Sequence, residues 1–319
     1  MRLPLHSPRT LVTLVVFVVL AALPLLTQAF DQRYLLSIGT RIVIWSIAAT
    51  SLNMILGYGG MVSFGHAAFF GIGGYAVGIM SHHGLSSGWV QWPVALLAAT
   101  AWAALVGALS LRTRGLYFIM ITLAFAQMMY YIFVSLKAYG GDDGLNLATR
   151  SQAGFGLDLK DELTWYYLCL ASMVAVLYLL NRIIDARFGR VLEAIRENET
   201  RMQSIGFATY GHKLAAFVIA GAIAGLAGAL LANHSSFVSP KLMHWTQSGM
   251  LMVMVIVGGV GHRYGGLIGA VVLLGLEELI AEFTLYSQLG VGIVLLGIVM
   301  FAPRGLAGLF PRRSPQRVT

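Results

Sequence analysis

Few residues of this sequence are spaced for catalysis. Ser63 and His66 stand one helical turn apart in the run SFGH, a spacing that could pair a nucleophile with a general base. The neighbouring sequence offers no third group to orient the histidine, so we interpret both residues as packing or pore-lining groups and keep an intramembrane hydrolase as an alternative. His82 and His83 are adjacent in HHGLSSG, but a metal ion needs at least one further ligand, and the pattern H-E-x-x-H is missing. We therefore predict neither a catalytic residue nor a metal site, only a solvated turn at the histidine pair.

Energy coupling also lacks a strong signal within the chain. The phosphate-binding pattern G-x-x-x-x-G-K-[ST] does not occur, and GHKL at Gly211 lacks its spacing. Glu277, Glu278 and Glu282 come near the end of an apolar run, where a proton relay is conceivable because Glu278 and Glu282 share a helix face. A water-exposed helix end is the favoured interpretation. No cofactor is predicted for this chain, and a proton-coupled secondary transporter is the alternative.

The composition indicates which kind of secondary-structure element positions these residues. The chain is 58% hydrophobic and 11% charged, against roughly 25% charged in an ordinary globular domain. Because a helix needs roughly 20 apolar residues to cross a bilayer, the length allows about eight to ten crossings. The single cysteine, Cys169, lies in an apolar run and can form no internal disulfide. The sequence therefore predicts an all-α, polytopic membrane bundle, with one transmembrane domain over residues 1–310 and a short basic tail over 311–319.

Apolar runs divide this domain into ten predicted spans, with eight as the alternative count. The first resembles a secretory signal, but its length and the lack of an A-x-A site favour a retained span. The eighth and ninth are short enough to be half-helices or re-entrant segments. The predicted spans cover residues 10–30, 35–56, 61–80, 92–111, 116–136, 164–184, 214–231, 249–261, 267–280 and 289–302.

Basic residues predict the orientation of these spans. With a cytoplasmic N-terminus, fifteen lysines and arginines fall on the cytoplasmic side and five on the outer side, as the positive-inside rule requires. Both termini and the polar loop 185–213 are then cytoplasmic. The net charge of +8 follows from this orientation, because the bases do not form a continuous face with interleaved aromatic residues, and a nucleic-acid partner is not expected.

The polar loop itself has helical periodicity. Residues 189–204 contain no proline, and apolar residues at helical spacing form one stripe on a charged helix. These are Leu192, Ile195, Met202 and Ile205. Glu197 and Arg201 have the favourable order for an i, i+4 ion pair, and Gly206 ends the helix. Because acids and bases alternate here, docking to a partner protein is favoured over attraction to anionic lipid.

A translocation path is expected where polar or glycine residues interrupt apolar runs, because a polar group facing lipid is costly. The glycine-rich stretch GYGGMVSFGHAAFFGIGGYAVG predicts a pathway-lining helix that breaks near residues 57–60. The candidate path residues are Asn53, Ser63, His66, Thr122 and Gln127. The alternative is that these residues only bond neighbouring helices. Gly221, Gly225 and Gly228 are predicted to allow close helix packing of the small-xxx-small kind.

Several long stretches resemble one known family. FGRVLEAIRENETRMQSIGFATYGHKLAAFVIAGAIAGLAGALLA, together with LNMILGYGGMVSFGHAAFFGIGGYAVG, LRTRGLYFIMITLAFAQ, YGGDDGLN and the closing FAPRGLAG, is similar to LivM-type permease subunits of branched-chain amino acid ABC importers. The resemblance runs in consistent order from Tyr34 to Leu309. It implies a multi-pass protein of the bacterial inner membrane that carries branched-chain amino acids. Other amino acids, amides such as urea, or small carboxylates are the alternative substrates.

The resemblance also implies partners and a docking segment. The expected partners are a LivH-like second permease, two cytoplasmic ATPases that bind ATP and magnesium, and an external solute-binding protein. The implied coupling helix docks into an ATPase through Glu193, Ala194, Arg196, Glu197, Glu199, Arg201 and Gly206. Relatives commonly carry a small alanine pair where Arg201 and Met202 stand, and often a glutamate and an arginine where Gln127 and Tyr130 stand. We therefore expect the docking surface of this chain to differ at Arg201 and Met202.

Overall fold

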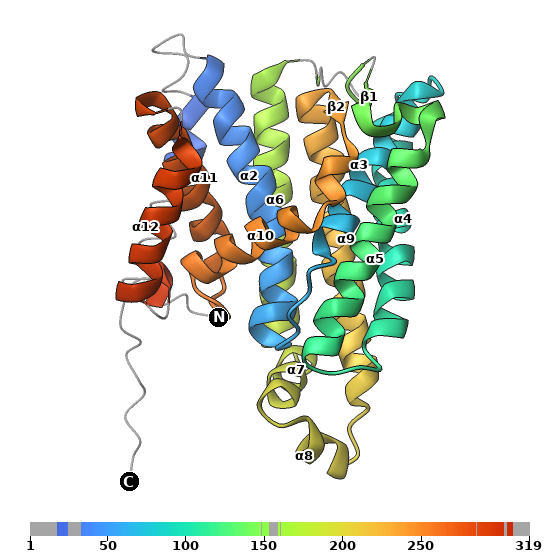
Figure 1. The fold of residues 1–319 in the computed structure, drawn as a ribbon, viewed down its shortest axis with the longest axis vertical. Helices are drawn as coiled ribbons and strands as arrows, with labels where there is room; N and C mark the ends of the chain where they lie inside the picture. Colours follow the sequence, from blue (N-terminus) through green and yellow to red (C-terminus); the bar gives the residue numbers. More distant parts are fainter. Residues whose placement is uncertain are drawn as a thin grey trace.

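The computed structural model describes residues 18–24, 33–147, 149–152, 159, 161–284, 286–302 and 305–308. Within these ranges the chain forms a bundle of α-helices, most of which run along its long axis (Figure 1). Residues 18–24 are helical. The long helices are α2 (Arg33–Asn53), α3 (His66–His82), α4 (Gly88–Ser110), α5 (Leu116–Ser135), α6 (Glu162–Asp185), α9 (Thr209–Ser235), α10 (Trp245–Gly258), α11 (Gly265–Phe283) and α12 (Ser287–Phe301).

The two ends of the bundle differ. At one end two short helices protrude, α7 (Arg187–Glu197) and α8 (Glu199–Ser204), and we call this the α7–α8 end (Figure 1). At the opposite end β1 (Leu145–Asn146) pairs antiparallel with β2 (Phe237–Val238), with Leu145 opposite Val238. We call this the β1–β2 end.

The predicted all-α membrane bundle agrees with this architecture, but the count of about ten spans is not confirmed. In the described residues, six helical segments are long and apolar enough to cross a membrane, and α10, with 14 residues, is shorter. α3 has only 17 residues and α11 carries three glutamates. The predicted first span lies mostly outside the described residues, and the predicted tail 311–319 lies entirely outside them. The six segments are Tyr34–Tyr58, Gly88–Ser110, Leu116–Ser135, Glu162–Asp185, Thr209–Ser235 and Ser287–Gly308.

The helical backbone is interrupted after α2, where the sequence predicts an interruption. The continuous but non-helical stretch between Tyr58 and His66 is called the chain break, or the break, below. A π-helix, Met54–Tyr58, continues α2, and helix resumes only at His66, five residues later than the predicted span at 61. Side chains of other helices satisfy the free backbone here, since Phe64 N donates to Thr122 Oγ1 (3.3 Å) and Ala67 N to Ser248 Oγ (2.9 Å). A non-helical segment can therefore be buried inside the bundle.

Glycines allow α3, α4 and α9 to pack with their backbones close together. Gly221 and Gly225 of α9 lie against Ala103 and Ala99 of α4. Gly228 lies against the backbone of Phe70 on α3. The structure thus places all three glycines singled out from the sequence in helix contacts where a larger side chain would collide.

Polar contacts fix the helix ends near the β1–β2 end. Asn233 of α9 is buried and its Oδ1 accepts bonds from the Ser151 backbone N and hydroxyl, both at 2.7 Å. Asp161 caps α6, because its carboxylate accepts bonds from the Thr164 hydroxyl (2.8 Å) and backbone N (3.1 Å). These bonds hold the pKa of the Asp161 carboxyl below its usual value, and the bond from the Thr164 hydroxyl contributes most.

Candidate functional site

The polar segment between α6 and α9 forms two helices, so the single helix predicted over residues 189–204 is wrong. Asn198 interrupts it with an extended backbone (φ −157°, ψ 94°). Its side-chain oxygen accepts a bond from Arg201 N at 2.9 Å and caps α8. Asparagine bonds its own neighbouring backbone in this way and so competes with helix. The predicted Glu197–Arg201 pair needs an unbroken helix, and the described residues contain no such ion pair.

The apolar stripe of this segment mostly faces the protein's own bundle. Leu192, Ile195 and Met202 are buried, whereas Ile205 is 64% exposed. Met202 is therefore not part of the exposed surface, which corrects the expectation that it would alter docking, while Arg201 is exposed. Of the other predicted docking residues, Glu193, Arg196, Glu197 and Gly206 are classed as exposed and Ala194 and Glu199 as half-buried.

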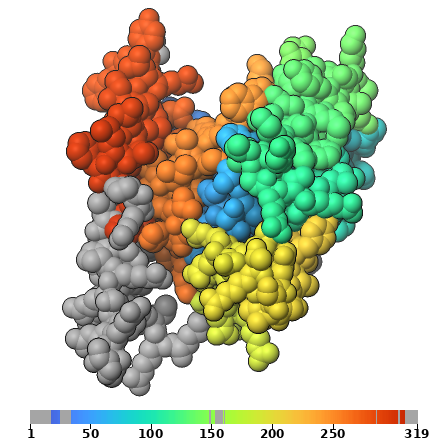
Figure 2. Space-filling model, turned by 60° about the horizontal axis from the view of Figure 1, so that its bottom comes forward, coloured from blue at the N-terminus to red at the C-terminus, as the bar shows by residue number. Residues whose placement is uncertain are grey.

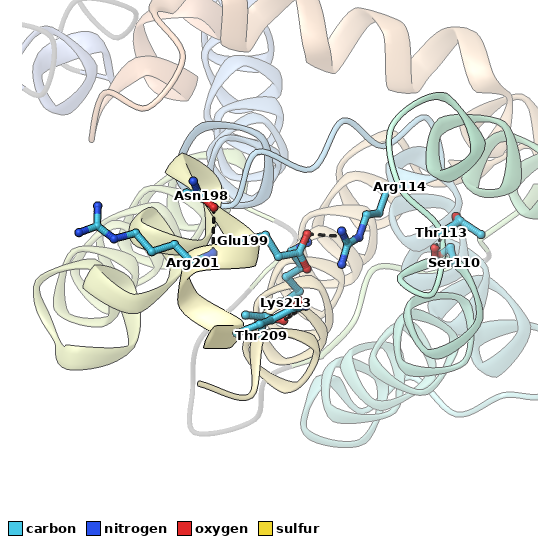
Figure 3. A network of polar contacts seen from close by, with 9 residues as sticks. Ser110, Thr113, Arg114, Asn198, Glu199, Arg201, Thr209 and Lys213 are labelled. Carbon is cyan, nitrogen blue, oxygen red and sulfur yellow. Dashed lines mark hydrogen bonds and ion pairs between the residues drawn. The ribbon is translucent and has the colours of Figure 1, made fainter. Parts of the chain in front are cut away.

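Glu199 holds α8 against the bundle instead of reaching outward. Its carboxylate pairs with Lys213 of α9 at 2.7 Å and with Arg114, in the α4–α5 turn, at 3.5 Å (Figure 3). Only 20% of the Glu199 side chain and 16% of the Lys213 side chain is exposed. Because partly buried pairs are screened less by salt than exposed ones, this network fixes α8 in place. The sequence assigned Glu199 to docking, and nothing in the local sequence indicates Arg114 as its partner.

The surface next to α8 combines charge with apolar groups. After Gly206, whose φ of 88° favours glycine, come the exposed side chains of Phe207 (43%) and Tyr210 (41%). With Ile205 they give three exposed apolar side chains in the segment between α8 and the first turn of α9. In the tilted view this part of the chain, in yellow, forms a lobe that projects from the molecule (Figure 2). Such a mixed, protruding surface can dock a partner protein.

Four of the five predicted path residues are buried and bonded around the chain break. Ser63 Oγ accepts from Gly65 N (3.2 Å), and Thr122 Oγ1 accepts from Phe64 N. His66 Nε2 is bonded to Ser51 Oγ at 2.7 Å. Asn53 binds the backbone of residues 261 and 262. Asn53, His66 and Thr122 thus bond neighbouring segments, as the alternative expects, whereas the bond of Ser63 stays within its own segment. A role of these residues in the translocation path stays a prediction.

Gln127 differs from the other four. It is half-buried, and its Oε1 is buried without a hydrogen-bond partner in the described part of the chain. One turn further along α5, Tyr130 lies 5.3 Å, ring to ring, from His244. His244 contacts Trp245 (5.8 Å), which in turn contacts Phe64 of the chain break (6.4 Å). This aromatic group joins α5, the break and the start of α10, and no spacing in the sequence predicts it.

The remaining candidate chemistry is not assembled. The structure gives Ser63 and His66 different partners, so it does not join them as nucleophile and base. Among the described residues, no group of three histidines, cysteines or acids could hold a metal ion. Of the three glutamates, Glu277 pairs with Arg41 at 3.9 Å and Glu278 accepts a bond from the Tyr34 hydroxyl.

Comparison with known proteins identifies the family. The family described as branched-chain amino acid transport system / permease component matches residues 34–303. The chain is 30% identical over 308 residues to the high-affinity branched-chain amino acid transport system permease protein LivM of Escherichia coli (strain K12), which covers 89% of this chain and 72% of that protein.

More distant relatives agree. A probable branched-chain amino acid transport permease protein LivM of Methanocaldococcus jannaschii is 24% identical over 323 residues (85% of this chain, 92% of that protein). The LivH permease of Escherichia coli (strain K12) is 23% identical over 283 residues (83% and 91%). No solved structure matches the chain. The chain belongs to the permease-component family of branched-chain amino acid transport systems.

Proposed function

We propose that this chain is one permease subunit of an ABC importer that moves branched-chain amino acids across the bacterial inner membrane. A LivH-like permease would supply the other half of the pathway, and an external solute-binding protein would deliver the substrate. Two ATPases would bind ATP and magnesium and drive the cycle, and this chain would bind no cofactor itself. The relatives, which are described as branched-chain amino acid transport permeases, support this substrate class in preference to urea, other amides or small carboxylates.

One observation carries the proposal of ATPase coupling: the protruding α7–α8 end. Its apolar stripe is buried against the bundle, and Glu199 is paired with two residues of other segments. The segment is therefore attached firmly to the bundle while its outer face stays exposed. A partner protein that binds the outer face and moves it would therefore also move the helices to which the segment is attached. A loop without such contacts could not transmit that movement.

The distribution of charge supports a cytoplasmic location for this end. Among the lysines and arginines whose side chains are described, nine lie at the α7–α8 end, three lie toward the β1–β2 end, and Arg41 lies within α2. The nine are Arg112, Arg114, Arg182, Arg187, Arg190, Arg196, Arg201, Lys213 and Arg263, and the three are Lys137, Arg150 and Lys241. With this orientation and ten passes of the chain, both termini would be cytoplasmic.

Charge reversal on the exposed face tests ATPase docking. Glu193→Lys inverts an exposed charge on α7, and Gly206→Pro is incompatible with φ of 88°. Both variants should insert into the membrane normally and lose co-purification of the ATPases. Asp143→Lys, which reverses another exposed acid at the β1–β2 end, is the matched control and should retain co-purification. Normal co-purification with both test variants would count against docking at this segment.

Transport assays test the driving force. Uptake of leucine, isoleucine or valine into proteoliposomes should require the second permease, the ATPases and ATP. Proton-driven uptake by this chain alone would instead support the secondary transporter, which the family match does not favour.

A further inference from the structure

Arg196 is exposed as a whole, but its side chain bends toward the bundle and its bond to Gly57 is partly buried. Its guanidinium donates to the carbonyl oxygen of Gly57, near the end of the π-helix that follows α2. Its aliphatic stem passes Gly60, where an added Cβ would lie 2.9 Å from Arg196 Cγ. Its Nη1 also lies 3.5 Å from the position of a Cβ added at Gly261. The side chain thus reaches the chain break and the turn between α10 and α11 at once.

The residues that lead into the break, at the end of α2 and in the π-helix, are themselves bonded to or in close contact with this turn. Asn53 Oδ1 accepts a bond from Gly261 N (2.9 Å), and Asn53 Nδ2 donates to His262 O (2.7 Å). A Cβ on Gly57 would lie 2.6 Å from Gly261 Cα. We call this cluster of Asn53, Gly57, Gly60, Arg196, Gly261 and His262 the inner junction.

Helix electrostatics favours a cation at the inner junction. The π-helix ends at Tyr58 and α10 ends at Gly258, so two helix C-termini meet here. The last carbonyls of a helix have no intrahelical partner, and their aligned dipoles carry partial negative charge. Arg196 supplies a donor and a positive charge to this site. Arg263 is a second cation nearby, and it pairs with the carboxylate of Asp185 at the end of α6 (3.1 Å from Nη1).

The segments held at the inner junction lead directly into the middle of the bundle. The break runs on to Phe64, whose backbone N is bonded to Thr122 of α5. α10 carries Ser248, which binds Ala67 N at the start of α3. α10 is therefore bonded to the first turn of α3, which follows the break, while the turn after α10 is bonded at the inner junction to the residues that precede the break. A displacement of α7 that carries Arg196 with it must act on both segments.

We propose that Arg196 is the positioning residue that passes movement of α7 to the chain break and to α10. The sequence suggested a docking role for this residue, whereas its contacts assign it to transmission. The proposal rests on ATPase docking at the α7–α8 end, since that partner would supply the movement.

The first test needs no ATPase. Hydrogen exchange of the purified chain should increase at least fivefold in residues 57–65 and 259–264 in Arg196→Gln. In Arg190→Gln, which removes an exposed cation from the same helix, exchange there should match the wild type. Unchanged exchange in Arg196→Gln would overturn the proposal whatever the partner is.

The second test uses the assembled importer. In Arg196→Gln the ATPases should co-purify and hydrolyse ATP within about twofold of wild type, while leucine uptake per ATP falls at least tenfold. Arg190→Gln should keep the wild-type ratio. A wild-type ratio in Arg196→Gln, or loss of ATPase co-purification in that variant alone, would overturn transmission through Arg196.

A third variant covers a folding failure of Arg196→Gln. Arg196→Lys keeps the charge at the helix ends but loses the planar reach of the guanidinium, so it should fold and lower uptake per ATP at least threefold. An unchanged ratio in Arg196→Lys would then overturn the proposal. If the wild-type chain recruits no ATPase, the proposed function fails, and the exchange experiment still decides the role of Arg196.

Discussion

Replacing Gly228 by alanine should loosen the packing of α9 on α3. A Cβ at this position would lie 2.7 Å from the carbonyl carbon of Phe70, and closer still to the Phe70 oxygen. Ordinary contacts begin at about 3.4 Å, and both groups belong to helical backbone that cannot rotate away. The two helices must therefore move apart to admit one methyl group.

The expected cost follows from that displacement. Overpacking a well-packed core costs about 1–3 kcal/mol, and a gap of 0.5–1 Å forfeits roughly a quarter to a half of each neighbouring dispersion contact. Alanine returns about 0.5–1 kcal/mol by its better helix propensity. The net loss should be about 1–2 kcal/mol, which corresponds to a fall of roughly 1.5–3 °C in apparent Tm for a chain of 319 residues.

The assay is thermal unfolding of the detergent-solubilised chain, followed by loss of the monodisperse peak in size-exclusion chromatography. Gly275→Ala on α11 is the matched control, because a Cβ there meets nothing within 4 Å, and it should be neutral or slightly stabilising. Equal apparent Tm values for Gly228→Ala and Gly275→Ala would refute the packing argument.

Three further predictions concern caps and exposed faces. Asn198→Ala removes the α8 cap and should cost about 1 kcal/mol locally, measured as faster hydrogen exchange in residues 199–204; unchanged exchange would show that the cap contributes nothing. Asp161→Ala should speed exchange in the first turn of α6 at pH 7. Since the native pKa of Asp161 is lowered, its contribution is present above the unfolded-state pKa and lost as pH falls through the native one, so wild type and variant should converge in acid. Ser37 lies on the α2 face that carries Arg41, whose side chain is 46% exposed. Because a charged face borders water or a partner and not lipid, the cysteine of Ser37→Cys should react with a membrane-impermeant maleimide. Labelling as slow as that of buried Cys169 would contradict this.

The sequence predicts the features that depend on local composition. Apolar runs mark the long helices, glycines mark the break after α2, and mixed charges mark the α7–α8 end. The interruption at Asn198 could not be foreseen, because the apolar spacing from Leu192 to Ile205 continues across it and an exposed asparagine is tolerated within a helix. Only the bond from Arg201 N to the side chain of Asn198 shows that Asn198 caps α8 instead of continuing the helix of α7.

Contacts between distant parts of the chain are a different problem. β1 pairs with β2 although helices α6 to α9 lie between them in the sequence. Arg196 of α7 likewise bonds to Gly57, which lies far from it in the sequence. An arginine on an amphipathic helix looks the same in sequence whether it faces water or a helix C-terminus. Its direction depends on which helices end beside it, and that is set by the packed bundle.

The polar residues inside the apolar runs show why path residues are hard to select from sequence. A membrane span that stops being helical exposes backbone groups that lipid cannot satisfy, so every break requires polar side chains from neighbouring segments. Thr122, Ser248 and Asn53 meet that requirement here. Polar side chains inside apolar runs are therefore expected at helix breaks as well as along a pathway, because in both places they avoid facing lipid. Gln127, half-buried with an unbonded oxygen, is the candidate that no break accounts for, which makes the aromatic group beside it the better place to look for substrate contacts.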